Sequence, residues 1–224
     1  MALVTWTGTV SSTWAVAGNW DTNTIPIAGD SVRFTNASTV DCNVLGNTAA
    51  LLDIDFTNYA GTVTISDGFN LIVAGNILLS TAGTFNITTP ATGTLTMSAS
   101  GTLTTYGRTI NCILRLINAT GTPAASTTIT VQLADNVTLS KGFTALGSPV
   151  GNVVLRSSLP GTQRLLTLQN IEGVRQDIDY LNVIDINGNQ GVTMWSYKGA
   201  APVNSNNWLI MSTQPVPTSG FGIN

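Results

Sequence analysis

The chain contains no histidine, and charged residues of either sign are scarce. Its 224 residues include 8 Lys plus Arg and 11 Asp plus Glu, for a net charge of −3, and Glu172 is its single glutamate. Without histidine there is no Ser-His-Asp triad, no histidine general base and no histidine metal ligand. So few basic residues also argue against nucleic-acid binding, which needs clustered cations to neutralise phosphates. We therefore predict a non-enzymatic protein with no catalytic residue, no metal site and no cofactor.

Long apolar runs are missing as well. No run approaches the ~18 residues of a membrane-spanning helix, so we expect no membrane association. The start of the chain has no basic segment followed by an apolar one, which predicts synthesis in the cytoplasm without a secretory signal. Cysteine is limited to Cys42 and Cys112, which lie far apart in apolar runs. This placement predicts two buried free thiols rather than a disulfide or a metal site.

Short alternating runs of aliphatic and small polar residues fill residues 49–140, for example GTVTIS and GTLTMSAS. Alternation with a period of two directs one set of side chains into a core and the other into water. Threonine suits the outer face because it is both β-branched and polar. The pattern predicts an all-β fold and burial of six side chains: Val63, Ile65, Leu95, Met97, Leu103 and Ile129.

The same region is weakly self-similar. Gly-Thr followed by an alternating run begins at Gly61, Gly83, Gly93 and Gly101. The starts are about two dozen residues apart, or half that, which is typical of a solenoid whose coils carry two or three strands each. The pattern favours a parallel β-helix. A β-sandwich or jelly roll remains the alternative, because its hairpins use similar strands and turns.

Changes in composition divide the chain into three segments: an aromatic-rich N-terminal cap (residues 1–45), a β-helix body (residues 46–212) and an extended Pro- and Gly-rich arm (residues 213–224). Aromatic loops near a terminus can cover the open end of a solenoid. Alternatively, Trp14 and Trp20 could contact carbohydrate, because sugars stack on exposed indole faces. In the arm, Phe221 and Ile223 are candidate interface residues.

The N-terminal segment carries Asn19-Trp20, then Pro26, then Gly29-Asp30 and the strand pattern Ser31–Phe34. This order, followed by Thr- and Gly-rich repeats, resembles the start of β-helical surface proteins and phage structural proteins of the virion decoration or fibre type. The resemblance implies a β-helix and a position on a virion or cell surface. It carries no catalytic residues.

Together with the low charge and the C-terminal arm, this resemblance implies a bacteriophage capsid decoration or cement protein. We expect a homotrimer on the capsid or tail exterior that contacts the major capsid protein or other virion proteins. The first alternative is a tail fibre, tailspike or adhesin-like module that binds surface polysaccharide. A soluble polysaccharide-degrading enzyme comes third.

Two acidic stretches are candidate functional sites. The alternation predicts that Asp177 and Asp179 face outward and that Ile178 and Tyr180 face inward. Two carboxylates on one strand could form a glycosidase pair, but solvated surface acids are the favoured interpretation.

The second stretch, residues 185–189, resembles the start of a calcium-binding loop. Gln190 and Ser196 replace the glycine and the closing glutamate of that loop. A tight turn is therefore the predicted structure.

Overall fold

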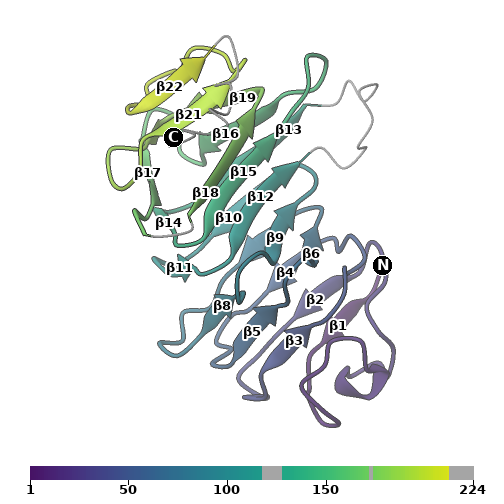
Figure 1. The fold of residues 1–224 in the computed structure, drawn as a ribbon. Helices are drawn as coiled ribbons and strands as arrows, with labels where there is room; N and C mark the ends of the chain where they lie inside the picture. The colour runs from purple at the N-terminus through teal and green to yellow at the C-terminus, as the bar shows by residue number, and fades with distance from the viewer. Residues whose placement is uncertain (118–127, 172–173, 212–224) are drawn as a thin grey trace, which may run out of the picture.

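The computed structural model describes residues 1–117, 128–171 and 174–211. These residues form a nearly all-β protein built from parallel sheets, as the sequence predicted (Figure 1). Their one helical element is the short 3-10 turn η1 (Ala17–Asn19).

The strands fall into four sheets. The eight-stranded sheet contains β1 (Leu3–Thr5), β2 (Ser31–Arg33), β4 (Ile54–Asp55), β7 (Ile77–Leu78), β10 (Gly101–Thr104), β13 (Ile129–Leu133), β16 (Val153–Ser157) and β19 (Leu181–Ile184). The seven-stranded sheet contains β6 (Asn70–Val73), β9 (Thr94–Met97), β12 (Ile113–Ile117), β15 (Gly142–Leu146), β18 (Arg175–Asp179), β21 (Met194–Tyr197) and β22 (Trp208–Met211). The two smaller sheets contain β3 (Cys42–Val44), β5 (Thr62–Ile65) and β8 (Asn86–Thr88), and β11 (Thr109–Ile110), β14 (Val137–Leu139), β17 (Arg164–Leu168) and β20 (Ile186–Asn187).

From β3 to β21 successive strands enter different sheets, and the chain returns to a given sheet one layer further on. From β10 the chain visits the eight-stranded, four-stranded and seven-stranded sheets in turn, and it repeats this order through β21. Every named strand pair among the described residues is parallel. This topology is compatible with a β-solenoid, and it lacks the antiparallel hairpins on which a sandwich depends.

The strands of the N-terminal segment belong to these same sheets. Strand β1 pairs with β2, and β2 pairs with β4, which lies beyond residue 45. Strand β3 likewise pairs with β5 across that position. The segment before residue 45 therefore supplies stacked strands as well as the aromatic residues that close the end.

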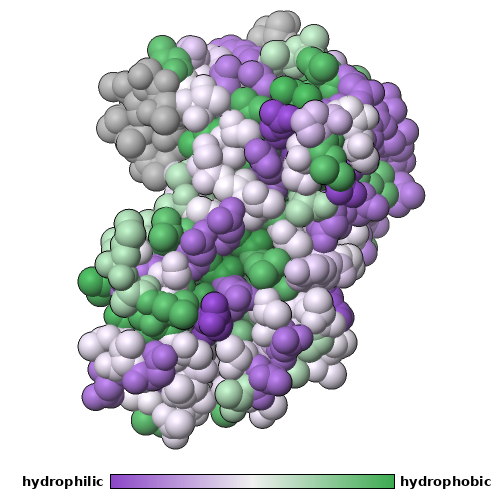
Figure 2. Space-filling view, turned by 180° about the vertical axis from the view of Figure 1, so that it is seen from behind, coloured by the Kyte–Doolittle hydropathy of each residue, from purple (hydrophilic) through white to green (hydrophobic). Residues whose placement is uncertain are grey.

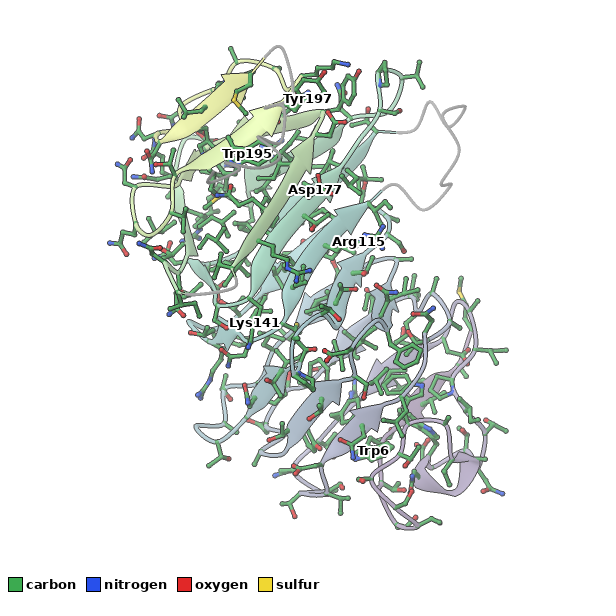
Figure 3. The ribbon with its side chains drawn as sticks, viewed as in Figure 1. Trp6, Arg115, Lys141, Asp177, Trp195 and Tyr197 are labelled. Atoms are coloured by element: carbon green, nitrogen blue, oxygen red, sulfur yellow. The ribbon has the colours of Figure 1, made fainter. Side chains whose placement is uncertain are left out.

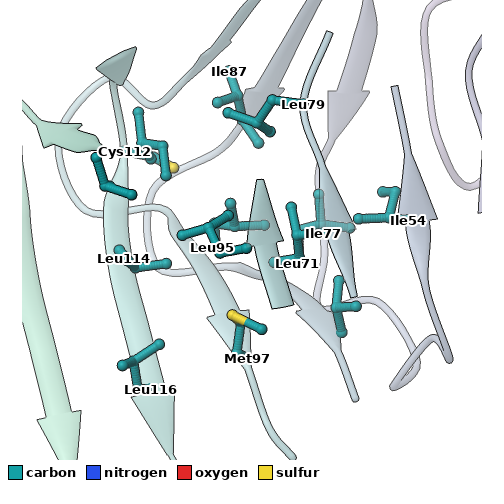
Figure 4. Close-up of a cluster of buried hydrophobic side chains, with 14 of the residues drawn as sticks. Ile54, Leu71, Ile77, Leu79, Ile87, Leu95, Met97, Cys112, Leu114 and Leu116 are labelled. Carbon is teal, nitrogen blue, oxygen red and sulfur yellow. The ribbon is translucent and has the colours of Figure 1, made fainter. Parts of the chain in front are cut away.

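The core consists of columns of aliphatic side chains that follow the strand register. In the seven-stranded sheet Leu71 pairs with Leu95 and Leu95 with Leu114, so equivalent inward side chains stack layer upon layer (Figure 4). The six side chains that the alternation placed in the core are each at most 2% exposed, so this prediction is confirmed. Period-two alternation thus determines which side of each strand is buried.

Polar side chains at the bends between strands hydrogen-bond to backbone of the adjacent layer. The Asp53 carboxylate accepts the backbone N–H of Asn76, 2.6 Å away, and the Asn76 side chain accepts that of Thr102 at 2.9 Å. Eight of the ten aspartates, all of them described, accept at least one backbone N–H: Asp21, Asp30, Asp41, Asp53, Asp55, Asp67, Asp135 and Asp185. Most of the acidic residues therefore satisfy backbone groups that the sheets leave unpaired.

Glycine is required where the layers approach most closely. A Cβ atom at Gly101 would lie 2.1 Å from the carbonyl oxygen of Gly75, and one at Gly93 would lie 2.2 Å from that of Ile65. Both residues begin Gly-Thr repeats, so close approach of the backbone explains these two glycines. No heavy atom lies within 4 Å of the corresponding position at Gly83.

An aromatic cluster closes the N-terminal end. The ring of Trp20 lies 5.1 Å from that of Trp6 and 4.7 Å from that of Trp14, both nearly edge-on. The indole N–H of Trp20 donates to the Trp14 carbonyl, and that of Trp6 donates to the Val40 carbonyl. Trp20 is only 2% exposed, which confirms that it is buried at this end.

Both cysteines are buried free thiols, as predicted. Burial raises the pKa of Cys112 to about 12 and raises the pKa of Cys42 well above its ordinary value. The thiolate is the reactive form, so neither side chain is suited to redox chemistry or metal binding in the folded protein.

Acid should destabilise the fold through the hydrogen-bonded aspartates. The backbone N–H groups of Thr92 and Ala91 hold the pKa of Asp67 below its ordinary value of 3.8. Stability from such a group is present above the unfolded-state pKa and is lost as the pH falls through the folded-state value. We expect the urea midpoint to be steady down to about pH 5 and to fall below about pH 4. The Asp67→Asn variant, which keeps an oxygen acceptor but cannot be protonated, should lose less stability between pH 5 and pH 3.

Asp177→Asn is the matched control, because Asp177 makes no hydrogen bond to a described residue. An acid response of Asp67→Asn identical to that of the unmodified chain would contradict the assignment to this carboxylate.

Candidate ligand-binding face

The two tryptophans considered for carbohydrate binding are part of the closed end. Trp14 is 4% exposed and Trp20 is 2% exposed, so neither presents an indole face to a ligand. Their ring faces are covered by each other and by Phe34, whose centroid lies 6.2 Å from that of Trp14. The sugar-platform interpretation of Trp14 and Trp20 therefore does not fit their positions. The candidate interface residues Phe221 and Ile223 lie outside the described residues, so their role stays a prediction.

Several cations take part in holding the fold together. Arg108 donates to the carbonyls of Ser80, Thr81 and Gly83 in the preceding layer. The Nε of Arg33 lies 3.5 Å from Oδ2 of Asp55. The guanidinium groups of Arg108 and Arg33 therefore form contacts within the fold.

Four cations form no side-chain hydrogen bond or ion pair with the described residues. Arg164 begins β17 in the four-stranded sheet. Arg115, Lys141 and Arg175 lie on or directly beside the seven-stranded sheet. Asp177 and Asp179, the two aspartates outside the eight that accept a backbone N–H, are on the outer side of the same sheet. Three of these four cations thus lie on or beside one sheet, together with the two aspartates.

Strand register places these residues in line. Arg115 pairs with Thr144, and Thr144 pairs with Asp177. On the next pair of strands Asp179 pairs with Tyr197, which puts Trp195 in the row of Asp177. Figure 3 shows Arg115 on β12, Asp177 on β18 and Trp195 on β21 along the seven-stranded sheet. We call the outward residues Arg115, Thr144, Asp177, Asp179, Trp195 and Tyr197 the β12–β21 face.

Aromatic rings occupy the C-terminal part of this face. Trp195 and Tyr197 are both half-exposed, in contrast to the buried tryptophans at the other end. The Lys198 ammonium lies 4.6 Å from the ring centroid of Tyr197 and 5.7 Å from that of Tyr180. Hydrogen bonds with these two tyrosines raise the pKa of Lys198, which keeps it cationic. Trp195 therefore offers a partly open ring two residues from Tyr197, over which the Lys198 ammonium lies.

The acidic pair predicted on β18 is found in part. Asp177 is exposed and Ile178 is buried, as expected. Burial raises the pKa of Asp179, while the charge of Lys198 and the Tyr180 N–H act in the opposite direction. The prediction that Tyr180 points into the core is wrong. The backbone at Tyr180 has φ of 49°, so the chain turns there and the side chain is half-exposed.

The tight turn predicted for residues 185–189 is found only as a bend at Asp185, because Ile186–Asn187 form β20. The carboxylate of Asp185 is already hydrogen-bonded within the fold. Asp185 accepts hydrogen bonds from the Asn204 side chain at 2.6 Å and from the Gly161 N–H at 2.9 Å, and these lower its pKa. Its φ is 57°. The described residues contain no group of three or more His, Cys, Asp or Glu placed to hold a metal ion.

The outer side of the eight-stranded sheet carries a polar recess instead of a row of charged and aromatic residues. An open recess of ≈ 260 Å³ there is lined by Arg33, Thr35, Asn36, Asp55, Thr57 and Asn58. Its two charges face each other, and Asp55 also accepts a hydrogen bond from the Thr57 N–H. In the view from behind, pale and purple polar residues cover most of the surface and green apolar residues lie among them near the middle (Figure 2). The recess is polar, but its charges are less available to a ligand than those of the β12–β21 face.

A scan against protein-family models, a search of curated proteins and a search of solved structures each found no match to this chain. In the three described stretches, no helix has the length and apolar character needed to cross a bilayer.

Proposed function

We propose that this chain is a non-enzymatic structural protein of a bacteriophage virion, a capsid decoration or cement protein with a β-helical body. The observation that carries the proposal is the use of seven aspartates and of Arg108 to bond backbone of one layer to the next. Such a body is stiff, and few of its charged groups are left for chemistry. The resemblance of residues 19–34 and of the following repeats to phage structural proteins supports the virion location.

The proposed assembly is a homotrimer on the capsid or tail exterior that contacts the major capsid protein or other virion proteins. Among the described residues only one ion pair, Arg33–Asp55, is formed, and most acidic groups bind backbone. An interface built from extended salt bridges is therefore disfavoured. Apolar and hydrogen-bonded contacts are the expected mode of association.

This proposal predicts salt-resistant attachment. The purified chain should scatter light as an oligomer and should co-sediment in fixed stoichiometry with capsids of the source phage. Both properties should survive ~1 M salt, where the screening length is about 3 Å and exposed ion pairs are weakened. Apolar burial is not weakened by such screening.

The same measurements at 50 mM salt provide the reference. A chain that stays monomeric at every concentration and does not sediment with capsids would contradict the proposed function. Dissociation at high salt alone would contradict the apolar mode of association.

A fibre, tailspike or adhesin-like module that binds surface polysaccharide is the second candidate function. The half-exposed Trp195, in line with Asp177 and Arg115, favours it. Stacking of a sugar ring on an open indole needs the exposure that Trp14 and Trp20 lack.

A further inference from the structure

We propose that the β12–β21 face, together with Lys141 and Arg175 beside it, binds a carboxylated saccharide chain, such as a glycan that contains uronic or sialic acids. This inference rests on the second candidate function and names its site and its ligand class. It does not depend on where the protein is located in a virion.

Three cations without partners in the described residues form the carboxylate-binding part. Ile113 pairs with Gly142 and Gly142 with Arg175, so Arg175 begins β18 beside the start of β15, which Lys141 immediately precedes. Arg115 lies two residues into β12, on the same side of the sheet. Adjacent strands are ~4.8 Å apart, so these three strands span about 10 Å. A guanidinium group can bind a carboxylate through two parallel hydrogen bonds, which favours an anionic ligand group here.

The rest of the row suits sugar rings and hydroxyl groups. Thr144 and Asp177 follow Arg115 on the next two strands, and Trp195 follows Asp177. The carboxylate of Asp177 can accept hydrogen bonds from sugar hydroxyls, and the hydroxyl of Thr144 can both donate and accept. The flat apolar side of a pyranose ring can stack on the indole of Trp195. From β12 to β21 the row covers about 15 Å, which is enough for several linked sugars.

The mixture of charges selects against other polyanions. Asp177 and Asp179 lie among the cations and would repel a ligand with a charge on every unit, such as a nucleic acid. A glycan carries its carboxylates further apart, with neutral hydroxyl-rich rings between them. Such a chain can place a carboxylate at Arg115 and a neutral ring at Trp195.

The test is binding of the full chain to a panel of immobilised oligosaccharides that contain uronic or sialic acids, and to the same oligosaccharides after reduction of their carboxyl groups. We expect retention of acidic glycans and about tenfold weaker binding of the reduced forms, the usual effect of losing one charged hydrogen-bonded contact. Trp195→Ala and Arg115→Gln should each weaken binding of the acidic glycan about tenfold or more. Arg115→Gln should also reduce the dependence of binding on salt.

Two matched variants serve as controls. Arg156→Gln removes a half-buried strand arginine from the outer side of the eight-stranded sheet, and Tyr106→Ala removes an exposed aromatic ring from a bend. Both should bind the glycans like the unmodified chain, and melting curves should show all four variants folded at the temperature of the binding assay. The proposal is overturned if no acidic glycan is retained, if the reduced forms bind equally well, or if Trp195→Ala binds normally. Capsid co-sedimentation measured on the same variants reports separately on the virion proposal.

Discussion

Leu103→Asp is expected to prevent folding. Leu103 is completely buried in β10, where it pairs with Ile77 on one side and Leu133 on the other. The substitution would place a carboxylate in an apolar column with no partner, and an isolated buried charge costs far more than a domain's stability of about 5–15 kcal/mol. A shift of β10 by one residue cannot rescue the fold, because it would turn every side chain of the strand to the opposite side of the sheet.

Thr102→Asp is the matched control, since Thr102 is the preceding residue of the same strand and points outward. We expect soluble expression, a β-rich circular dichroism spectrum and a cooperative melt for Thr102→Asp, and insoluble or unfolded protein for Leu103→Asp. Normal melting of Leu103→Asp would mean that the inward and outward sides of β10 are assigned incorrectly.

Much of the fold could be predicted because alternation is a local property. The inward side chains of Val63, Ile65 and Leu95 follow directly from a period of two, and Gly93 and Gly101 lie where the backbone of two layers meets. The layer spacing could not be predicted in the same way. The number of residues between paired positions of adjacent layers varies along the chain. Leu95 pairs with Leu114, whereas Phe143 pairs with Gln176, which lies much further on in the sequence.

The candidate site depends on that spacing, which explains why the sequence did not indicate it. Arg115, Thr144 and Asp177 are distant in the chain and come into line only through the register of three strands. Alternation between the buried Met194 and Ser196 could have placed Trp195 on the outside. The tryptophans near the N-terminus are the more conspicuous candidates in the sequence, and nothing in their local sequence distinguishes a buried cap from an exposed platform.

Trp20→Ala should lower the free energy of unfolding by roughly 3–5 kcal/mol, the usual range for removing a large buried aromatic side chain. The indole of Trp20 packs against the rings of Trp6 and Trp14 at the end of the solenoid-like stack, and its N–H is bonded to the Trp14 carbonyl at 2.9 Å. Its removal would leave a cavity that the surrounding rings cannot fill and would deprive a buried carbonyl of its donor.

Trp195→Ala removes the same side chain from a half-exposed position and is the natural comparison. We expect it to lower the unfolding free energy markedly less than Trp20→Ala does, because part of the ring is already in water. Urea unfolding followed by circular dichroism should therefore separate the two variants, with equal m-values showing that both unfold from the same compact state. Glycan binding should respond in the opposite way. Trp195→Ala should lose glycan retention, and Trp20→Ala should keep it at temperatures where that variant is folded. Equal destabilisation by the two substitutions would remove the distinction between a tryptophan that closes the fold and one that faces a ligand.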